Sequence, residues 1–239
     1  MKAKKSLGQN FFINENLGKY ILDRIVHDNI DTVVEIGPGL GFFTKKLVER
    51  FKNVIVIEKD FELAQNLQTE FPEITVLNKD FLDIDLKQLV EGNAIYFGSL
   101  PYNVSKPIIR KITTDPTFIH GAYFIVQKEV AEKYLYKKPY NILSLTTNIY
   151  TNVKKEFDIS PASFRPQPKV TSSFISFTKK DLPNTDVKKL EELIKGAFKQ
   201  PRKNLRNNLK GTEYISKIDE YAEKRPAELS LEEYISLLD

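Results

Sequence analysis

The segment Thr32-Val33-Val34-Glu35-Ile36-Gly37-Pro38-Gly39-Leu40-Gly41 joins an apolar run to a glycine-rich loop. The apolar part predicts a buried strand at 32–36, because β-branched residues favour strands and an unbroken apolar run fits a strand covered on both faces. The glycines let the backbone approach a ligand closely and leave amide groups free to bind it. We therefore expect an α/β fold with a ligand site beyond the carboxyl end of this strand.

Strand and helix patterns alternate after this segment, and a helical pattern precedes it. Further strands are expected at 53–58, 73–77, 94–97 and 121–126, and helices at 16–26, 42–51, 61–70 and 129–136. Such alternation predicts a parallel sheet with helices on both faces. A proline-rich loop at 164–170 then leads to an alternating pattern at 172–177, which predicts a late antiparallel strand.

After residue 186 only helical patterns are visible. They lie at 187–198, 202–209, 215–223 and 231–238. The change predicts two domains: an α/β domain over residues 1–180 and a small all-helical domain over 181–239.

Composition excludes several classes of chemistry. The chain has 239 residues and no cysteine, which excludes disulfides, thiolate metal sites and cysteine nucleophiles. His27 and His120 are the only histidines and lie far apart in the sequence, so no metal site is expected. No apolar run approaches the roughly 20 residues of a membrane span, and the basic start runs into polar Gly8-Gln9-Asn10 instead of an apolar core. We expect a cytoplasmic protein.

The net charge is only +4, but the basic residues are unevenly distributed. A stretch near the C-terminus has no acidic residue and contains Lys195, Lys199, Arg202, Lys203, Arg206 and Lys210. Such local excess suits a polyanion such as nucleic acid, because phosphates attract clustered cations. The alternative is a solvated helix face.

Acidic residues follow the next two predicted strands. Glu58 ends the second strand, where a carboxylate can accept both hydroxyls of a ribose, and Asp80 follows the third, where it can accept from an adenine amino group. Taken singly, the loop around Gly37 and Gly39 can be a tight turn, Glu58 a solvated charge and Asp80 a helix cap. Their coincidence at three consecutive strand ends favours an adenosine-bearing cofactor.

The fourth strand leads to Ser99-Leu100-Pro101-Tyr102. A short polar side chain, a backbone carbonyl and a flat ring can together hold an exocyclic amino group and stack its base. The glycine spacing differs from the Gly-x-Gly-x-x-Gly of dinucleotide dehydrogenases, and no phosphate-binding Gly-Lys-Ser/Thr follows the turn. S-adenosylmethionine fits these residues better than either alternative.

Three motifs together resemble one known family, the rRNA adenine N6-dimethyltransferases, over nearly the whole chain. They are Ser6-Leu7-Gly8-Gln9-Asn10-Phe11-Phe12, Val34-Glu35-Ile36-Gly37-Pro38-Gly39-Leu40-Gly41 and Phe97-Gly98-Ser99-Leu100-Pro101-Tyr102-Asn103-Val104-Ser105. The resemblance implies a Rossmann-like class I S-adenosylmethionine-dependent methyltransferase sheet with a small helical C-terminal domain that grips rRNA.

The resemblance also implies roles for the residues around the cofactor. Asn10 and Phe12 are expected to close over S-adenosylmethionine, and Gly37 to approach it. Glu58 is expected to hold the ribose and Asp80 the adenine.

On the target side the catalytic motif is Ser99-Leu100-Pro101-Tyr102, with Ser99 also beside the cofactor. Ser99 and the Leu100 carbonyl are expected to bind the target amino group, Tyr102 to stack on the target base and Phe164 to cover its other face. The family usually has asparagine where this chain has Ser99. Serine is shorter and can donate as well as accept, so weaker positioning of the amino group is expected.

The family has two branches, the KsgA-type small-subunit enzymes and the Erm-type large-subunit enzymes. Gln127-Lys128-Glu129-Val130, the loop at 164–170 and the helix at 198–209 favour KsgA; 76–80 and 108–112 read more like Erm. We expect dimethylation of two adjacent adenines in the 3′-terminal hairpin of 16S rRNA, by a monomer acting on a small subunit or its precursor. The alternatives are an Erm-type 23S rRNA enzyme that confers macrolide resistance and a non-catalytic assembly factor.

Overall fold

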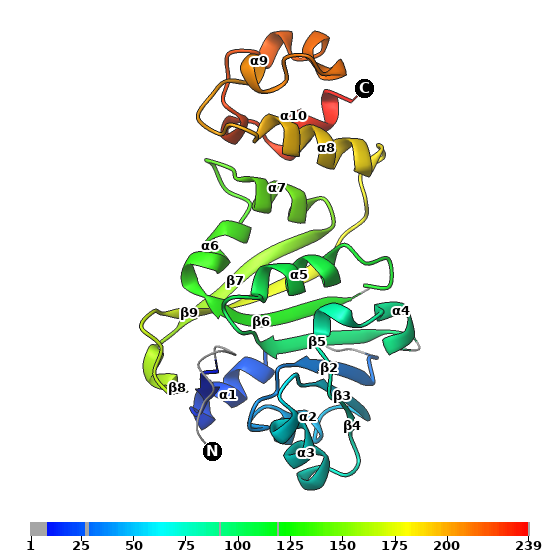
Figure 1. Ribbon diagram of the computed structural model, residues 1–239, viewed down its shortest axis with the longest axis vertical. Coiled ribbons are helices and arrows are strands. Elements are labelled where there is room, and N and C mark those ends of the chain that lie inside the picture. Colours follow the sequence, from blue (N-terminus) through cyan, green and yellow to red (C-terminus); the bar gives the residue numbers. More distant parts are fainter. Residues whose placement is uncertain (1–8, 27–28, 91, 119, 239) are drawn as a thin grey trace. The chain divides into compact units, whose positions relative to one another are not determined.

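The computed structural model describes residues 9–26, 29–90, 92–118 and 120–238 (Figure 1). The motif residues Ser6-Leu7-Gly8 and His27 lie outside these ranges. The chain divides into two compact units. Unit 1 comprises Met1–Glu132 and Lys154–Lys179, and unit 2 comprises Lys133–Val153 and Lys180–Asp239.

The strands are β1 (Phe11–Phe12), β2 (Thr32–Ile36), β3 (Asn53–Ile57), β4 (Thr75–Leu77), β5 (Ala94–Ser99), β6 (Gly121–Gln127), β7 (Thr151–Ile159), β8 (Phe164–Arg165) and β9 (Ser172–Lys179). The α-helices are α1 (Glu15–Leu22), α2 (Thr44–Leu47), α3 (Phe61–Glu70), α4 (Leu86–Leu89), α5 (Ser105–Thr113), α6 (Lys128–Tyr134), α7 (Ile142–Asn148), α8 (Val187–Ala197), α9 (Leu205–Asn208) and α10 (Leu231–Ser236). Short 3-10 helices lie at Phe81–Asp83, Pro161–Ser163, Glu213–Ser216, Asp219–Tyr221 and Pro226–Glu228.

The central sheet has the strand order β4-β3-β2-β5-β6-β9-β7. Strand β2 lies between β3 and β5 and is parallel to both, β6 is parallel to β5, and β9 is antiparallel to β6. This confirms the predicted parallel sheet with a late antiparallel strand. The chain leaves β2 toward β3 and β4, then returns to the other side of β2 with β5, so the strand order reverses at β2. Ligands bind in the crevice that such a reversal opens at the carboxyl ends of the strands.

Helices pack on the sheet and remove its apolar side chains from water. Helix α2 packs against β3, α3 against β4 and α5 against β6; Figure 1 shows α5 in front of β6. Within the described ranges, no helix has both the length and the apolar content that crossing a membrane requires.

Several elements differ from the prediction. Strand β7 was not predicted, because its polar residues hide the alternation. Its Lys155 pairs with Glu132 of helix α6 at 2.7 Å. Helices α5 and α7 were also missed. The helix expected at 215–223 is wrong, since two 3-10 helices take its place, and the helices expected at 42–51 and 202–209 shorten to the single turns α2 and α9.

Unit 2 has its own apolar core. Leu145 of α7 and Ile149, which directly follows that helix, are buried in one cluster with Leu190 and Ile194 of α8. The division after Lys179 falls where the domain boundary was expected, but residues 133–153, placed by that expectation in the first domain, belong to unit 2. These residues belong to unit 2 because the apolar face of α7 packs in the core of that unit, and this face was not predicted from the sequence.

Candidate active site

A cavity in unit 1 lies at the carboxyl ends of β2, β3, β4 and β5, where the strand order reverses. It brings together nearly all of the residues predicted for the cofactor and the target base, namely Asn10, Gly37, Gly39, Glu58, Asp80, Ser99, Leu100, Pro101, Tyr102 and Phe164. Phe12 is the exception, because its ring lines a smaller adjoining cavity that shares Gly37, Gly39 and Ser99 with the first. The individual roles of these residues stay predictions.

The loop after β2 forms one wall, and its conformation requires glycine. Gly37 and Gly39 have φ angles of +67° and +60°, in the left-handed region that side chains disfavour. A Cβ atom on Gly39 would also lie 3.0 Å from the Phe11 ring. The Gly37 amide donates to the Ile57 carbonyl at 2.9 Å, so the loop is tied to the end of β3.

Glu58 follows β3 and is only 7% exposed. Its Oε1 accepts from the Asp60 amide at 2.8 Å and its Oε2 from the Gly39 amide at 3.2 Å. Burial raises the pKa of Glu58, and these amide hydrogen bonds oppose the rise because they favour the ionised form. The carboxyl group is therefore fixed against the glycine loop, with acceptor capacity left for a ligand in the cavity.

Asp80 follows β4 and does two things at once. Its Oδ1 accepts from the Leu82 amide at 3.0 Å, which caps the 3-10 helix Phe81–Asp83. Its Oδ2 accepts from Lys59 Nζ at 2.8 Å, and this bond lowers the pKa of Asp80. Asp80 therefore caps a helix, as one interpretation of the sequence predicted, and also lines the cavity.

The end of β5 and the residues that follow it form another part of the lining. Ser99 is the last residue of β5, and the Leu100 amide donates to the Ile125 carbonyl at 3.0 Å. Strands β5 and β2 approach so closely at Gly98 that a Cβ atom there would lie 2.5 Å from the Ile36 carbonyl oxygen. This close packing fixes Ser99 beside the glycine loop.

Two aromatic residues, Tyr102 and Phe164, also line the cavity. The Tyr102 hydroxyl lies 2.8 Å from Ser172 Oγ, and burial raises the pKa of Tyr102. Phe164 is paired with Phe12 across β1 and β8, and their rings meet edge to face at 5.3 Å. Tyr102 and Phe164 therefore both line the cavity, from different parts of the sequence.

Comparison with known proteins agrees with this geometry. Residues 1–236 match the family model described as ribosomal RNA adenine dimethylase. The chain belongs to this family. It is 37% identical to the ribosomal RNA small subunit methyltransferase A of Malacoplasma penetrans, covering 98% of this chain and 90% of that protein.

Solved structures of similar fold include a dimethyladenosine transferase from Plasmodium falciparum, with a TM-score of 0.81, 22% identity and 95% of this chain and 96% of that chain covered. The 23S rRNA methyltransferase ErmE gives a TM-score of 0.78 at 22% identity, covering 96% of this chain and 98% of that chain. Both support the fold: a Rossmann-like class I methyltransferase sheet, as expected.

Some cavity residues of this dimethylase-family chain were not predicted. They include Gln9, Phe11, Lys59, Phe81 and Asn103. Lys59 and Phe81 directly follow Glu58 and Asp80 in the sequence. Their position next to these two predicted site residues was therefore a signal that they line the same cavity. Gln9 is placed by a hydrogen bond from its Nε2 to Asp60 Oδ2 at 3.1 Å, which joins segments far apart in the sequence.

Glu35 was also missed as a site residue, because it lies inside the apolar run of β2. It is buried, accepts a 2.6 Å hydrogen bond from Thr44 Oγ1 and lines the smaller cavity. Burial raises the pKa of Glu35 from 4.5 to about 8, and the Thr44 hydrogen bond opposes this rise. A buried carboxyl group with a raised pKa thus lines the smaller cavity together with Gly37 and Gly39.

The six basic residues of unit 2 that were predicted to bind RNA fall into two sets. Lys195 pairs with Glu191 at 2.7 Å, and Arg206 pairs with Glu223 at 3.2 Å. The others are exposed and have no acidic partner among the described residues; they are Lys199, Arg202, Lys203 and Lys210. We refer to these four as the free basic set.

Proposed function

We propose that this chain transfers methyl groups from S-adenosylmethionine to the N6 amino group of adenines in rRNA. The targets we infer are the two adjacent adenines of the 3′-terminal hairpin of 16S rRNA, dimethylated during small-subunit biogenesis. One observation carries the proposal: a single cavity holds both the strand-end acceptors Glu58 and Asp80 and the segment Ser99–Tyr102. The small-subunit name of the relative at 37% identity supports this branch.

The cofactor side of the cavity fits S-adenosylmethionine, which supplies an electrophilic methyl group when bound. Glu58 would accept the ribose hydroxyls, because its carboxylate is buried and already oriented by two amides. Asp80 would accept from the adenine amino group with the acceptor capacity left beside Lys59 and the Leu82 amide. Glycine at 37 and 39 leaves space for the backbone to approach the ligand.

On the target side, Ser99 and Leu100 would orient the adenine amino group. Its nitrogen is a poor nucleophile because the lone pair is delocalised into the ring. Hydrogen bonds from N6 to Ser99 Oγ and the Leu100 carbonyl would favour a pyramidal nitrogen whose lone pair faces the methyl donor. Holding the reacting groups in line lowers the barrier by avoiding an entropic cost at the moment of reaction.

The base itself would be held by stacking. Tyr102 lines the cavity, and stacking on an aromatic side chain contributes about 1–3 kcal/mol per base. That gain offsets much of the cost of extruding the adenine from its surroundings. No general base is needed, because the alkylated nitrogen is acidic and releases its proton to water.

The remaining parts of the proposal concern partners. The free basic set would contact rRNA phosphates near the target, since unpaired exposed cations release counterions from a polyanion on binding. We further propose that the protein acts as a monomer in the cytoplasm, on a small subunit or its precursor.

The test is a direct competition between substrates. Unmodified small and large ribosomal subunits are incubated side by side with the protein and labelled S-adenosylmethionine, and rRNA fragments are analysed by mass spectrometry. The expected result is N6,N6-dimethyladenosine in the 3′-terminal 16S fragment. Label in 23S rRNA would support the Erm-type function instead. Cofactor binding without any methyl transfer would support a non-catalytic assembly factor.

A further inference from the structure

We propose that Ser172 is a positioning residue for the target base, because its hydroxyl fixes the ring of Tyr102. This inference rests on the proposed function and adds a residue to its machinery. Ser172 is the first residue of β9 and is completely buried. It does not line the cavity, so it would act on the base only through Tyr102.

The hydroxyl end of Tyr102 is held by one contact. Its oxygen lies 2.8 Å from Ser172 Oγ, an ordinary hydrogen-bond length in which either group can donate. The Tyr102 ring lines the cavity while its hydroxyl reaches the buried serine. The hydrogen bond therefore sets the direction of the ring's long axis along the cavity wall.

The backbone end of Tyr102 is held as well. The Val104 amide donates to the Pro101 carbonyl at 3.1 Å, which closes a turn around Tyr102. Ser105 Oγ donates to the Tyr102 carbonyl at 3.3 Å. With the backbone fixed by the turn, the contact with Ser172 is what selects the side-chain orientation.

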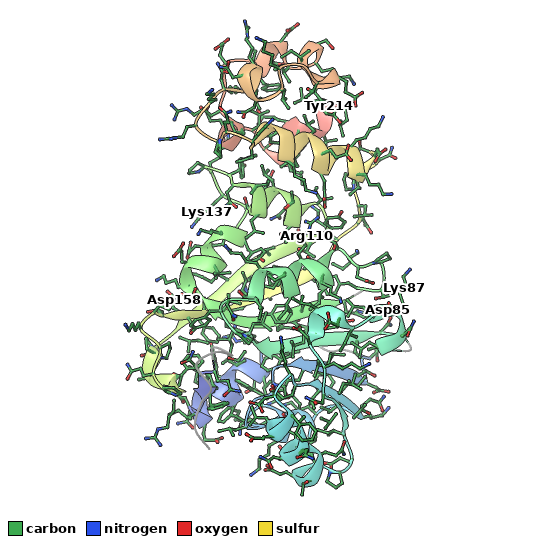
Figure 2. The ribbon with its side chains drawn as sticks, viewed as in Figure 1. Asp85, Lys87, Arg110, Lys137, Asp158 and Tyr214 are labelled. Atoms are coloured by element: carbon green, nitrogen blue, oxygen red, sulfur yellow. The ribbon has the colours of Figure 1, made fainter. Side chains whose placement is uncertain are left out.

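Ser172 is itself in a rigid place. The Lys128 amide donates to the Thr171 carbonyl at 3.0 Å, and Ser173 Oγ donates to Asp158 Oδ1 at 2.7 Å. Asp158, labelled on β7 in Figure 2, also pairs with Lys128 at 2.6 Å. Interactions on both sides of Ser172 thus fix the start of β9, and the hydroxyl is a stationary anchor for Tyr102.

A preoriented ring matters because methyl transfer depends on alignment. A stacking surface that can swing lets the adenine tilt, and small misplacements of a reacting group cost up to about a hundredfold in rate. Functional groups need support from surrounding residues to stay within productive geometry. Loss of the anchor should therefore slow methyl transfer and leave the cofactor side unchanged.

The experiment compares Ser172→Ala, Tyr102→Phe and the double variant in single-turnover methylation of small subunits, with cofactor affinity measured by calorimetry. We expect each variant to slow transfer about tenfold, since each removes the same hydrogen bond. The double variant should be no slower than either single one, and the dissociation constant of S-adenosylmethionine should stay unchanged. Ser176→Ala is the matched control, because Ser176 is also a buried serine of β9. Its Oγ donates to Glu156 Oε1 with a length of 2.9 Å, and Ser176 does not line the cavity.

Thermal unfolding of each variant separates slow transfer from loss of fold, and Tyr102→Phe tests the same contact without altering β9. Normal transfer by Ser172→Ala would overturn the proposal, as would a double variant in which the two losses multiply. If the unsubstituted protein binds S-adenosylmethionine but methylates no adenine, the proposed function itself fails.

Discussion

The cavity of unit 1 and the free basic set of unit 2 present opposite kinds of binding surface. In the cavity, Glu58 is buried and held by two backbone amides. In unit 2, Lys199 and Arg202 are exposed, with no acidic partner among the described residues. The first surface has a geometry set before any ligand arrives, whereas the second offers charge without fixed geometry.

This difference separates what each surface can recognise. A buried, oriented carboxylate distinguishes one small molecule from another, because a mismatched ligand leaves it without hydrogen bonds. Exposed lysines and arginines attract any polyanion, and salt screens that attraction. Single substitutions should therefore matter in the cavity, while in unit 2 only combined substitutions should.

The largest effect on binding is expected for Glu58→Gln, which removes the buried carboxylate from the cavity. The amide keeps the shape but removes the charge, and it must present its NH₂ group to one of the two backbone donors, the Gly39 or the Asp60 amide. Since hydrogen bonds to charged groups contribute about 1.5–3 kcal/mol, the dissociation constant of S-adenosylmethionine should rise about 10- to 100-fold. Calorimetric titration measures it.

The control for that prediction is Glu70→Gln, an exposed position at the end of α3. It should bind the cofactor normally, and both variants should bind rRNA as the unsubstituted protein does. Unchanged cofactor affinity in Glu58→Gln would remove the ribose role from Glu58.

An intermediate effect is expected when the free basic set is neutralised by Lys199→Ala, Arg202→Ala, Lys203→Ala and Lys210→Ala together. Each phosphate contact contributes about 0.7–0.9 to the slope of log K against log salt, so the slope should flatten by up to about 3. Fluorescence anisotropy with an RNA hairpin, repeated over a range of salt concentrations, measures it. Cofactor affinity should not change.

The paired cations provide the matched control. Lys195 and Arg206 already have the acidic partners Glu191 and Glu223. Lys195→Ala with Arg206→Ala should therefore flatten the salt slope less, per charge removed, than the fourfold variant. Equal effects per charge would mean that pairing in the free protein does not decide which cations meet RNA.

The same contrast explains how far sequence reasoning reached. The strand at 32–36 and the helix at 61–70 form at the predicted residues, because their apolar patterns are local and unbroken. The strand-end residues Glu58 and Asp80 were found because parallel strands bring their carboxyl ends to one edge. Topology alone therefore places them on one cavity.

What sequence reasoning missed depends on contacts between distant segments. Strand β7 carries charges that are paired only in the folded protein, as Lys155 is with Glu132 of helix α6. Ser172 reaches Tyr102 across seventy residues of sequence. In unit 2, α7 joins a core most of whose buried members come from residues 187 onward, so its apolar face has no local signature.

The effect expected from Glu35 is on the stability of the protein and its dependence on pH. Its folded-state pKa of about 8 exceeds the ordinary value of 4.5, so between these pH values the folded protein holds a proton that the unfolded chain has released. The folded state then binds more protons than the unfolded state, and stability falls as the pH rises through this window. Below about pH 4.5 the carboxyl is neutral in both states and has no such cost.

Glu35→Gln should flatten this dependence, because the amide cannot ionise yet still accepts from Thr44 Oγ1. For a chain of this size each 1 kcal/mol corresponds to about 2–4 °C in Tm, so the Tm difference between variant and unsubstituted protein should grow by several degrees from pH 5 to pH 8 in the variant's favour. Glu192→Gln, at an exposed position on α8 of unit 2, is the matched control and should keep the original profile. If Tm depended on pH in the same way in Glu35→Gln and in the unsubstituted protein, Glu35 would already be ionised at pH 5. The smaller cavity would then carry a fixed negative charge. The expected divergence would instead make the buried side of the comparison the pH-sensitive one.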